Sequence, residues 1–274
     1  MSSRTVFFIS DQTGVTSETL GNSLMTQFDG LQVQRITLPF LESADKAREA
    51  VQTINAIARS DGRKPIVFST LVQDELRDIV TGADAFVLDF FETFLEPLER
   101  ELGQPSAHAT GRAHGMADTQ IYDRRIEATN FALSCDDGSR IENYTQADLI
   151  LVGVSRSGKT PTSLYLALQY GIFVANFPLT EDEFEGEGLS SALAAYRDKL
   201  FGLTIAPRRL EEIREARRAG SRYASPQQVG YELRQADALF DRYGIPHLDT
   251  TARSVEEIAS WILRETGIRR TQAS

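Results

Sequence analysis

The stretch LVGVSRSGKTPTSLYLALQYG, residues 151–171, decides which fold we expect for this chain. Its part GVSRSGKT (153–160) matches the phosphate-loop pattern G-x-x-x-x-G-K-S/T at every fixed position. The apolar run DLILVGV (148–154) precedes the loop and a helical pattern follows it, which is the context that a phosphate loop requires. A glycine-rich turn with an incidental lysine is the alternative, and it leaves this context unexplained. The stretch therefore predicts that a phosphate or a nucleotide binds to a fold of strands and helices.

Each residue type in the loop has a role in holding phosphate. Gly153 and Gly158 let the backbone curl so that successive N–H groups face one anion, beside the positive end of a helix dipole. Lys159 is expected to bridge the terminal phosphates, and Thr160 to place its hydroxyl on Mg²⁺. Arg156 is an additional cation that either touches phosphate or faces solvent. The expected nucleotide-binding residues are Gly153, Val154, Ser155, Arg156, Ser157, Gly158, Lys159 and Thr160.

Upstream of the loop, apolar runs and helical patterns alternate over the first hundred residues. Strands are expected at residues 5–10, 33–40 and 64–70, with a fourth apolar run at 85–91. Helices are expected at residues 16–28, 43–60 and 72–82. Strands that alternate with helices imply a mostly parallel sheet that is covered on both faces.

The same alternation resumes at the loop and continues to the last helix. Strands are expected at residues 147–154, 173–179, 199–205 and 245–251. Helices are expected at residues 160–171, 207–225, 226–244 and 254–267, with an acidic loop at 180–188. In the less regular middle of the chain, only residues 122–134 look helical. We therefore predict an α/β protein in three parts. These are an N-terminal α/β domain at 1–105, an irregular connecting region at 106–145, and a P-loop, kinase-like domain with a mostly parallel sheet at 146–274.

The composition argues against several classes of function. The net charge of −10 makes the chain a poor general binder of nucleic acid or of an anionic membrane. No apolar run approaches the roughly 18 residues that span a bilayer. The N-terminal apolar run continues without a cleavage site, so it reads as a strand rather than a signal peptide. Cys135 is the only cysteine, so no internal disulfide can form, and we expect a cytoplasmic protein.

The carboxylates that a nucleotide enzyme uses to hold Mg²⁺ do not follow the loop. Neither of the next two expected strands, 173–179 and 199–205, ends in an acid, as the metal-binding strand of common P-loop NTPases does. The nearest strand-terminal acid, Asp89, and the pair Asp136 and Asp137 all lie upstream. The pair belongs to CDDG (135–138), which supplies a metal ligand or a general base, or is an ordinary Asp-Gly turn. The residues alone favour the turn slightly.

Two other loops are candidates for contact with an anion. In the connecting region, Arg112 and His114 suggest an anion-facing loop, whereas His108 is expected to be structural or solvated. Residues 10–18, SDQTGVTSE, follow the first strand and form either a second anion loop or an ordinary helix cap.

Arginines concentrate in one stretch of this acidic chain. Its members are Arg208, Arg209, Arg214, Arg217, Arg218 and Arg222. On a helix, Arg214, Arg217 and Arg218 share one face. They either form ion pairs with neighbouring glutamates or belong to a lid or docking surface whose arginine stabilises the transferring phosphate. Arg222 has no acid near it in sequence and is the expected phosphate contact.

These motifs resemble those of a known family, the bifunctional regulators of phosphoenolpyruvate synthase and of pyruvate, phosphate dikinase. The likeness covers nearly the whole chain and is closest to the bacterial branch that acts on phosphoenolpyruvate synthase, also called pyruvate, water dikinase. Its motifs here are FFISDQTGVTSETLG, ITLPF, YDRRIEATNFAL, DDG, GVSRSGKTPTSLYLA, KLFGLTIAPRRLEEIREARR, SRYAS and SVEEIA. The family pattern usually reads His-Asp-Asp-Gly where this chain has Cys135 in place of the histidine.

The resemblance implies an unusual pair of reactions on a partner protein. A threonine of the target is phosphorylated with ADP as the donor, which leaves AMP and inactivates the target. The phosphate is removed with inorganic phosphate, which forms pyrophosphate and restores the target. The threonine lies near the target's catalytic histidine, and the form with a phosphorylated histidine is preferred.

Carried over to this chain, the resemblance makes residues 153–160 the ADP site and Lys159, Asp136 and Asp137 the catalytic residues. It implies that Thr160 helps to hold Mg²⁺ and that phosphoenolpyruvate synthase is the protein partner. A homodimer is a further expectation. Three alternatives stay open here: the same chemistry on pyruvate, phosphate dikinase, a small-molecule P-loop kinase, and a nucleotide-binding switch without transfer chemistry.

Overall fold

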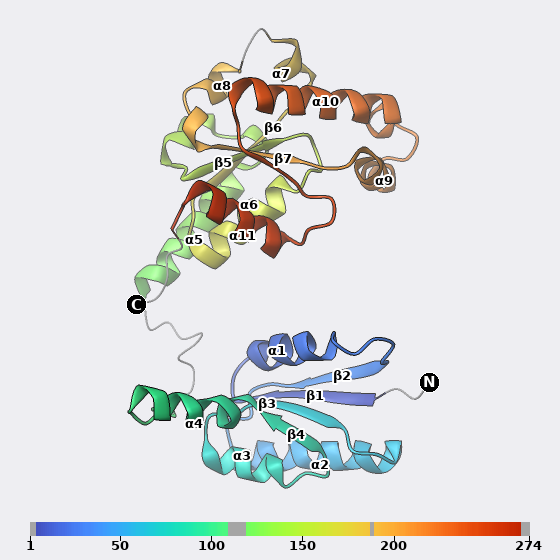
Figure 1. Cartoon of the computed structure of the whole chain (residues 1–274), viewed down its shortest axis with the longest axis vertical. Helices are drawn as coiled ribbons and strands as arrows, with labels where there is room; N and C mark the ends of the chain where they lie inside the picture. The colour runs from blue at the N-terminus through green and yellow to red at the C-terminus, as the bar shows by residue number, and fades with distance from the viewer. Residues whose placement is uncertain (1–3, 109–118, 187–188, 270–274) are drawn as a thin grey trace. The chain divides into compact units, whose positions relative to one another are not determined.

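Two separate four-stranded sheets organise the chain. The computed structural model describes residues 4–108, 119–186 and 189–269, and the chain divides into two units, Met1–Gly115 and Met116–Ser274 (Figure 1). Every strand pairing in both sheets is parallel, so the prediction of an α/β protein is confirmed. Each unit has hydrophobic clusters on both faces of its own sheet.

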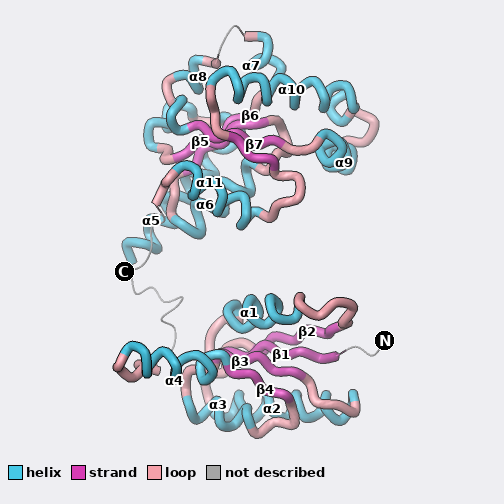
Figure 2. The backbone as a smooth tube through the Cα atoms, in the orientation of Figure 1, coloured by secondary structure: helices cyan, strands magenta, loops and turns pink. Residues whose placement is uncertain are grey.

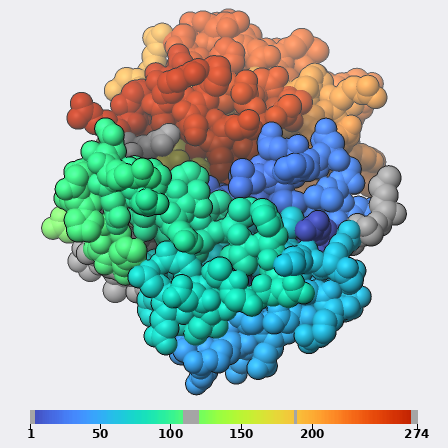
Figure 3. Space-filling view, turned by 60° about the horizontal axis from the view of Figure 1, so that its bottom comes forward, coloured from blue at the N-terminus to red at the C-terminus, as the bar shows by residue number. Residues whose placement is uncertain are grey.

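The first unit is a sheet in the order β2-β1-β3-β4 between two helical layers. Its strands are β1 (Arg4–Ser10), β2 (Val33–Leu38), β3 (Ile66–Thr70) and β4 (Phe86–Asp89). Its helices are α1 (Val15–Met25), α2 (Ala44–Asp61), α3 (Asp74–Thr81) and α4 (Phe90–Leu102). Residues of β1 alternate between the faces, because Phe7 and Ile9 pack with α2 and α3 whereas Val6 and Phe8 pack with α1 and α4. Figure 2 shows the two layers, and Figure 3 shows α2 (blue) and α4 (green) at this unit's surface.

The second unit repeats this strand order as β6-β5-β7-β8. Its strands are β5 (Leu149–Gly153), β6 (Val174–Pro178), β7 (Leu200–Thr204) and β8 (His247–Asp249). Its α-helices are α5 (Thr119–Ser134), α6 (Lys159–Tyr170), α7 (Glu181–Glu185), α8 (Ser191–Ala194), α9 (Pro207–Arg217), α10 (Pro226–Tyr243) and α11 (Val255–Thr266). Its short 3₁₀ helices are η1 (Asp136–Gly138), η2 (Ile141–Gln146), η3 (Arg197–Lys199) and η4 (Arg222–Ala224).

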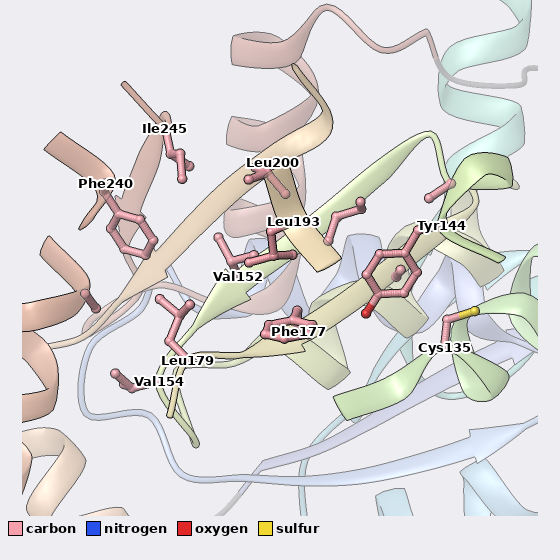
Figure 4. Close-up of a cluster of buried hydrophobic side chains, with 14 of the residues drawn as sticks. Cys135, Tyr144, Val152, Val154, Phe177, Leu179, Leu193, Leu200, Phe240 and Ile245 are labelled. Carbon is pink, nitrogen blue, oxygen red and sulfur yellow. The ribbon is translucent and has the colours of Figure 1, made fainter. Parts of the chain in front are cut away.

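The core of the second unit lies on both faces of β5. Ile150 and Val152 join a cluster with α9 and α10, while Leu149 and Leu151 pack with α6 and α11. Figure 4 shows the first cluster, in which Val152 and Phe240 come from a strand and a helix on either side of the core. Because both faces are buried, the strands are nearly continuous apolar runs rather than alternating patterns.

Two elements of the structure differ from the sequence expectation. No helix is expected after the apolar run at 85–91, yet α4 begins at Phe90. Asp89 caps this helix by accepting a hydrogen bond from the Glu92 N–H, and Pro97 in its interior disguises the helical pattern. The acidic segment expected as a loop contains the short helix α7, whose carboxylates stand near its positive N-terminal end.

The expected connecting region also differs from the structure. The helix expected at 122–134 is present as α5, but α5, η1 and η2 all belong to the second unit, so the two units divide after Gly115. The physical reason is apolar burial, because Phe131, Cys135 and Tyr144 lie in the core of the second unit.

Helix length and composition bear on membranes. Helices α2 and α10 have 18 residues each, but both carry several charged residues. Within the described ranges, no helix combines the length and the apolar character that a bilayer crossing needs.

Candidate phosphate-binding site

The loop between β5 and α6 lies at the carboxyl edge of the second sheet. Gly158 precedes α6 with φ 97°, a left-handed conformation that glycine adopts without strain. Gly153 ends β5, and a Cβ atom there would lie 2.4 Å from the Leu203 carbonyl oxygen, so no larger residue fits. Arg156 has φ 76° although it is not glycine. The loop ends at a helix N-terminus, where unpaired N–H groups and the helix dipole favour an anion.

Lys159 is the buried cation of the site. Only 4 % of its surface is exposed, and its Nζ donates a hydrogen bond to the Val154 carbonyl oxygen at 3.0 Å. Burial lowers the pKa of Lys159 to about 8, and the carboxylates of Asp137 and Asp136 partly oppose that shift. A phosphate bound here would favour the charged ammonium, because its negative charge would stabilise the ammonium in place of the water that burial excludes.

The acids that the neighbouring strands lack come from η1. The Thr160 hydroxyl donates a hydrogen bond to Asp136 Oδ1 at 2.8 Å, so a carboxylate from upstream in the sequence stands at the loop. Asn176 is fully buried in β6, donates to the same Asp136 oxygen and accepts the Asp137 N–H at 3.0 Å. Asn176 therefore holds the turn in place at the start of α6.

Asp137 has different surroundings from Asp136. It adopts φ 53°, a left-handed conformation that aspartate tolerates better than most residues, and its side chain is exposed. Among the described residues, its carboxylate forms no hydrogen bond. Gly138 follows with φ 77°, and a Cβ atom there would lie 3.2 Å from Pro178 Cδ, so the turn packs closely on the end of β6. The Asp137 carboxylate is thus available to exchange a proton.

These groups line a cavity of about 490 Å³. Its cations are Lys159, Arg156 and Arg217, the last from the C-terminal end of α9, and its carboxylates are Asp136 and Asp137. Its remaining lining residues are Ser155, Gly158, Thr160 and Pro161. Three cations against two carboxylates leave the cavity with a net positive charge, which suits an anion.

The arginine-rich helix α9 also supports the loop, through a buried arginine side chain. Arg214 is fully buried and pairs with Glu232 of α10, with 2.6 Å between Nη2 and Oε2. It donates to the carbonyl oxygens of Ser155 at 3.1 Å and Tyr223 at 3.0 Å, and its guanidinium lies 4.2 Å from the Tyr223 ring centroid. Arg214 therefore connects α9, α10 and η4 to the loop. This role differs from both expectations for the arginine-rich helix, because Arg214 belongs neither to a solvated ion pair nor to a lid.

The other predicted phosphate contacts lie elsewhere. Arg222 pairs with Glu181, with 2.7 Å between Nη2 and Oε1, and lines a neighbouring cavity rather than the loop cavity. No acid is near Arg222 in sequence, but Glu181 reaches it from 41 residues away. Arg112 and His114 lie outside the described residues, so their contacts stay predictions. His108 lies in the first unit, 3.7 Å from a surface carboxylate.

Cys135 does not line the cavity, although it directly precedes Asp136. Its side chain is fully buried in the cluster shown in Figure 4, which also contains Tyr144. Burial raises the pKa of the thiol, so it stays protonated and behaves as a small apolar side chain. The position at which this chain has Cys135 and the family pattern has histidine therefore lies in the hydrophobic core rather than in the cavity.

The donor atoms at the loop suit Mg²⁺. The Thr160 hydroxyl donates its hydrogen bond to Asp136, so the lone pairs of its oxygen can coordinate a cation. Hydroxyl and carboxylate oxygens are ligands that Mg²⁺ prefers, usually together with water and substrate phosphate. No group of three or more His, Cys, Asp or Glu side chains in the described part of the chain forms a metal cluster. Binding of Mg²⁺ is therefore expected to depend on bound phosphate.

The loop after β1 holds the equivalent position in the first unit. Gly14 precedes α1 with φ 82°, as Gly158 precedes α6. Val15 stands where the lysine would be, and Asp11 is a buried carboxylate whose pKa is raised by burial. The Ser17 hydroxyl donates to the Gly14 carbonyl oxygen at 2.8 Å. Because this loop has a valine in place of the lysine and a buried carboxylate nearby, it does not favour an anion, and an ordinary helix start is the better interpretation.

Some residues of the site escaped the sequence analysis. Asn176 is a buried amide in the apolar strand VANFP, and such a group must find hydrogen-bond partners, so it was a usable signal. Glu232 and Tyr223 offered no signal, because their contact with Arg214 depends on how α9, η4 and α10 pack.

Known proteins resemble this chain over almost its full length. A family model described as kinase/pyrophosphorylase matches residues 6–263. The chain is 52 % identical over 267 residues to a protein of Alcanivorax borkumensis, and 54 % identical over 266 residues to one of Burkholderia lata. In both cases the alignment covers 97 % of this chain and 98 % of the relative. Both relatives carry the name "putative phosphoenolpyruvate synthase regulatory protein".

Proposed function

The chain belongs to the kinase/pyrophosphorylase family, and from this membership we propose that it regulates phosphoenolpyruvate synthase by reversible phosphorylation of a threonine. ADP is the donor of the inactivating reaction, and inorganic phosphate removes the group and forms pyrophosphate. The observation that carries the proposal is the phosphate loop with Lys159 buried in it and Asp136 and Asp137 beside it. The names of the relatives point to the target enzyme, and the cytoplasm remains the expected location.

A diphosphate fits the groups that line the loop cavity. Backbone N–H groups of the loop and of α6 would cradle the two phosphates of ADP, and Lys159 would reach the β-phosphate. Arg156 and Arg217 add positive charge at the rim of the cavity. With the β-phosphate as the transferred group, AMP is the leaving group.

In the forward reaction, the threonine oxygen forms a bond to the β-phosphorus of ADP. The bond between that phosphorus and the oxygen bridging to the α-phosphate breaks, and AMP leaves. Asp137 accepts the hydroxyl proton, because its carboxylate is exposed and has no hydrogen bond to any described residue, whereas Asp136 is held by Thr160 and Asn176. Thr160 and Asp136 would hold Mg²⁺, which neutralises phosphate charge when bound.

In the reverse direction, an oxygen of inorganic phosphate forms a bond to the phosphorus of phosphothreonine. The bond between that phosphorus and the threonine oxygen breaks and pyrophosphate forms, while Asp137 accepts the proton of the attacking hydrogen phosphate and passes it to the threonine oxygen. Pyrophosphate and ADP both contain a diphosphate, so one cavity with one set of cations suits both directions.

The test uses the purified chain, Mg²⁺ and phosphoenolpyruvate synthase charged with its phosphohistidine. ADP labelled on the β-phosphate is compared with ATP labelled on the γ-phosphate, and Lys159→Ala serves as the control. We expect acid-stable label on threonine from ADP, and its loss in the Lys159→Ala variant. Label from ATP alone would contradict the donor assignment. Label only on pyruvate, phosphate dikinase, offered in a parallel reaction, would contradict the target.

A further inference from the structure

A series of hollows leads away from the phosphate loop across the second unit. Beside the loop cavity lies a second cavity of about 410 Å³, and Ser155 lines both. The junction is marked by a hydrogen bond between Ser155 Oγ and the Tyr223 hydroxyl at 2.9 Å. A third hollow of about 440 Å³ shares Glu181, Arg222 and Gln228 with the second. The series follows the space between α7 and α10, which lie side by side in Figure 1.

We propose that the second and third hollows form one acceptor groove, which binds the segment of the partner protein that carries the acceptor hydroxyl. The groove is defined here by Ser155, Asp182, Glu185, Arg222, Tyr223 and Gln228. This inference rests on the proposed function, because it names where the protein substrate of the phosphate loop binds. A nucleoside would fill one hollow, whereas two hollows in series suit an extended polypeptide.

The position of the groove on the loop separates the acceptor from the nucleoside. Thr160 and Pro161, at the start of α6, line the loop cavity but not the groove. In a phosphate loop, the backbone N–H groups cradle the phosphates nearer the nucleoside and the lysine reaches the terminal ones. Ser155 lies in the earlier half of the loop, away from the helix start, and lines the groove. The groove therefore enters on the side of the transferred phosphate.

The acid that accepts the proton lies toward the same side. The η1 helix, which contains Asp137, packs against β6. The wall of the groove is formed by Thr180 and Asp182, which follow β6 directly in the chain. A hydroxyl that arrives through the groove therefore approaches the end of the strand on which the Asp137 turn rests.

The charges of the groove indicate the chemistry of its occupant. Arg222 is compensated by its ion pair with Glu181. Asp182 and Glu185 are exposed and have no ion-pair partner among the described residues. Two uncompensated carboxylates favour an acceptor segment that has a basic residue near its hydroxyl-bearing residue.

The test reverses these two charges and measures two ligands separately. In the double variant Asp182→Lys/Glu185→Lys, we expect the KM for phosphoenolpyruvate synthase to rise by roughly tenfold. The Kd for ADP, measured by calorimetry, is expected to stay unchanged. Asp198→Lys/Glu265→Lys is the matched control, because it makes the same charge change at two exposed carboxylates that line a hollow at the amino edge of the sheet. This control is expected to change neither constant.

Each other result overturns the inference in a recognisable way. A weaker Kd for ADP with an unchanged KM for the synthase would assign the groove to the nucleoside. No change in either constant, with an active wild-type chain, would remove the groove from the reaction while leaving the proposed function intact. A wild-type chain that transfers no phosphate would overturn both.

Discussion

Lys159 and its neighbours illustrate how single side chains acquire functional properties from their surroundings. The ammonium is almost fully buried and hydrogen-bonds a loop carbonyl, so burial, rather than a nearby cation, is the main cause of its lowered pKa. Asp136 and Asp137 are adjacent in sequence, yet Asp136 accepts a hydrogen bond from Thr160, whereas the Asp137 carboxylate is exposed and has no hydrogen bond within the described part of the chain. The same residue type therefore suits two different roles.

Arg217 is expected to stabilise the charge of the transferring phosphate. Arg217→Ala should lower kcat by about a hundredfold, with a smaller effect on the KM for ADP, because such contacts strengthen in the transition state. Its side chain is exposed and has no ion-pair partner among the described residues, so the fold should be unaffected. Initial rates with labelled ADP test this. The control is Arg218→Ala, the next residue, which does not line the cavity. Equal losses in both variants would contradict a specific role.

Asp11 should make the first unit less stable at neutral pH. Burial raises its pKa, so the native state binds the proton more tightly than the unfolded state does. Stability therefore falls as pH rises from the unfolded pKa through the folded pKa, and the loss is complete above both. Asp11→Asn, which can still accept the Val72 N–H, should stabilise the protein at pH 7 but give no advantage near pH 3. Urea unfolding at both pH values measures this. A variant that is less stable at pH 7 would refute it.

The elements around the site come from distant parts of the sequence. The η1 helix lies upstream of the loop, Asn176 is on β6, and α9 and α10 supply Arg214 and Glu232. The parallel sheet explains their meeting, because the carboxyl ends of parallel strands open at one edge. The contact between α9 and α10 is the best place to test how these elements support the loop, because a buried ion pair joins the two helices.

Breaking the buried ion pair from one side should destabilise the second unit. Arg214→Met leaves the Glu232 carboxylate buried without its partner, which is expected to lower the free energy of unfolding by about 3–5 kcal/mol. The double variant Arg214→Met/Glu232→Leu removes both charges and should recover most of that loss. Denaturant unfolding of the wild type and the three variants, including Glu232→Leu, gives the coupling energy. Additive effects of the two substitutions would show that the pair is not coupled.

The whole chain contains the same strand order twice, although the sequence shows no repeat at a fixed period. The order is second, first, third and fourth strand in both units, and a left-handed glycine precedes the helix that follows the first strand of each sheet. Only the second unit has a lysine after that glycine, since Val15 occupies the position in the first. We therefore expect a division of labour in which the second unit binds the nucleotide.

Residues 116–274 should fold and bind ADP without the first unit. This segment has its own sheet, with hydrophobic clusters on both faces and all described residues of the loop cavity. Calorimetry is expected to give a Kd for ADP within about threefold of that of the full chain. Residues 1–115 alone should not bind ADP, and neither should residues 116–274 with Lys159→Ala. A segment 116–274 that is unfolded by circular dichroism would contradict this division.

Local sequence was sufficient for the α/β class, for most helices and strands, and for the strand, turn and helix around GVSRSGKT. A strand, a glycine-rich turn and a helix start all lie within residues 148–171, so their periodicity and backbone requirements can be read from one stretch. The family resemblance likewise rested on such contiguous motifs. Helix α4 was missed because Pro97 interrupts its pattern.

Only the tertiary structure decided which distant side chains complete the site. Asp136 reaches Thr160 across 24 positions, and the Arg214 guanidinium reaches the Ser155 carbonyl oxygen across 59. It also decided that Arg222 pairs with Glu181 instead of lining the loop cavity. Neither hydrophobic periodicity nor residue spacing contains these contacts. They arise because parallel strands bring loops from separate parts of the chain to one edge of the sheet, where packing then selects the partners.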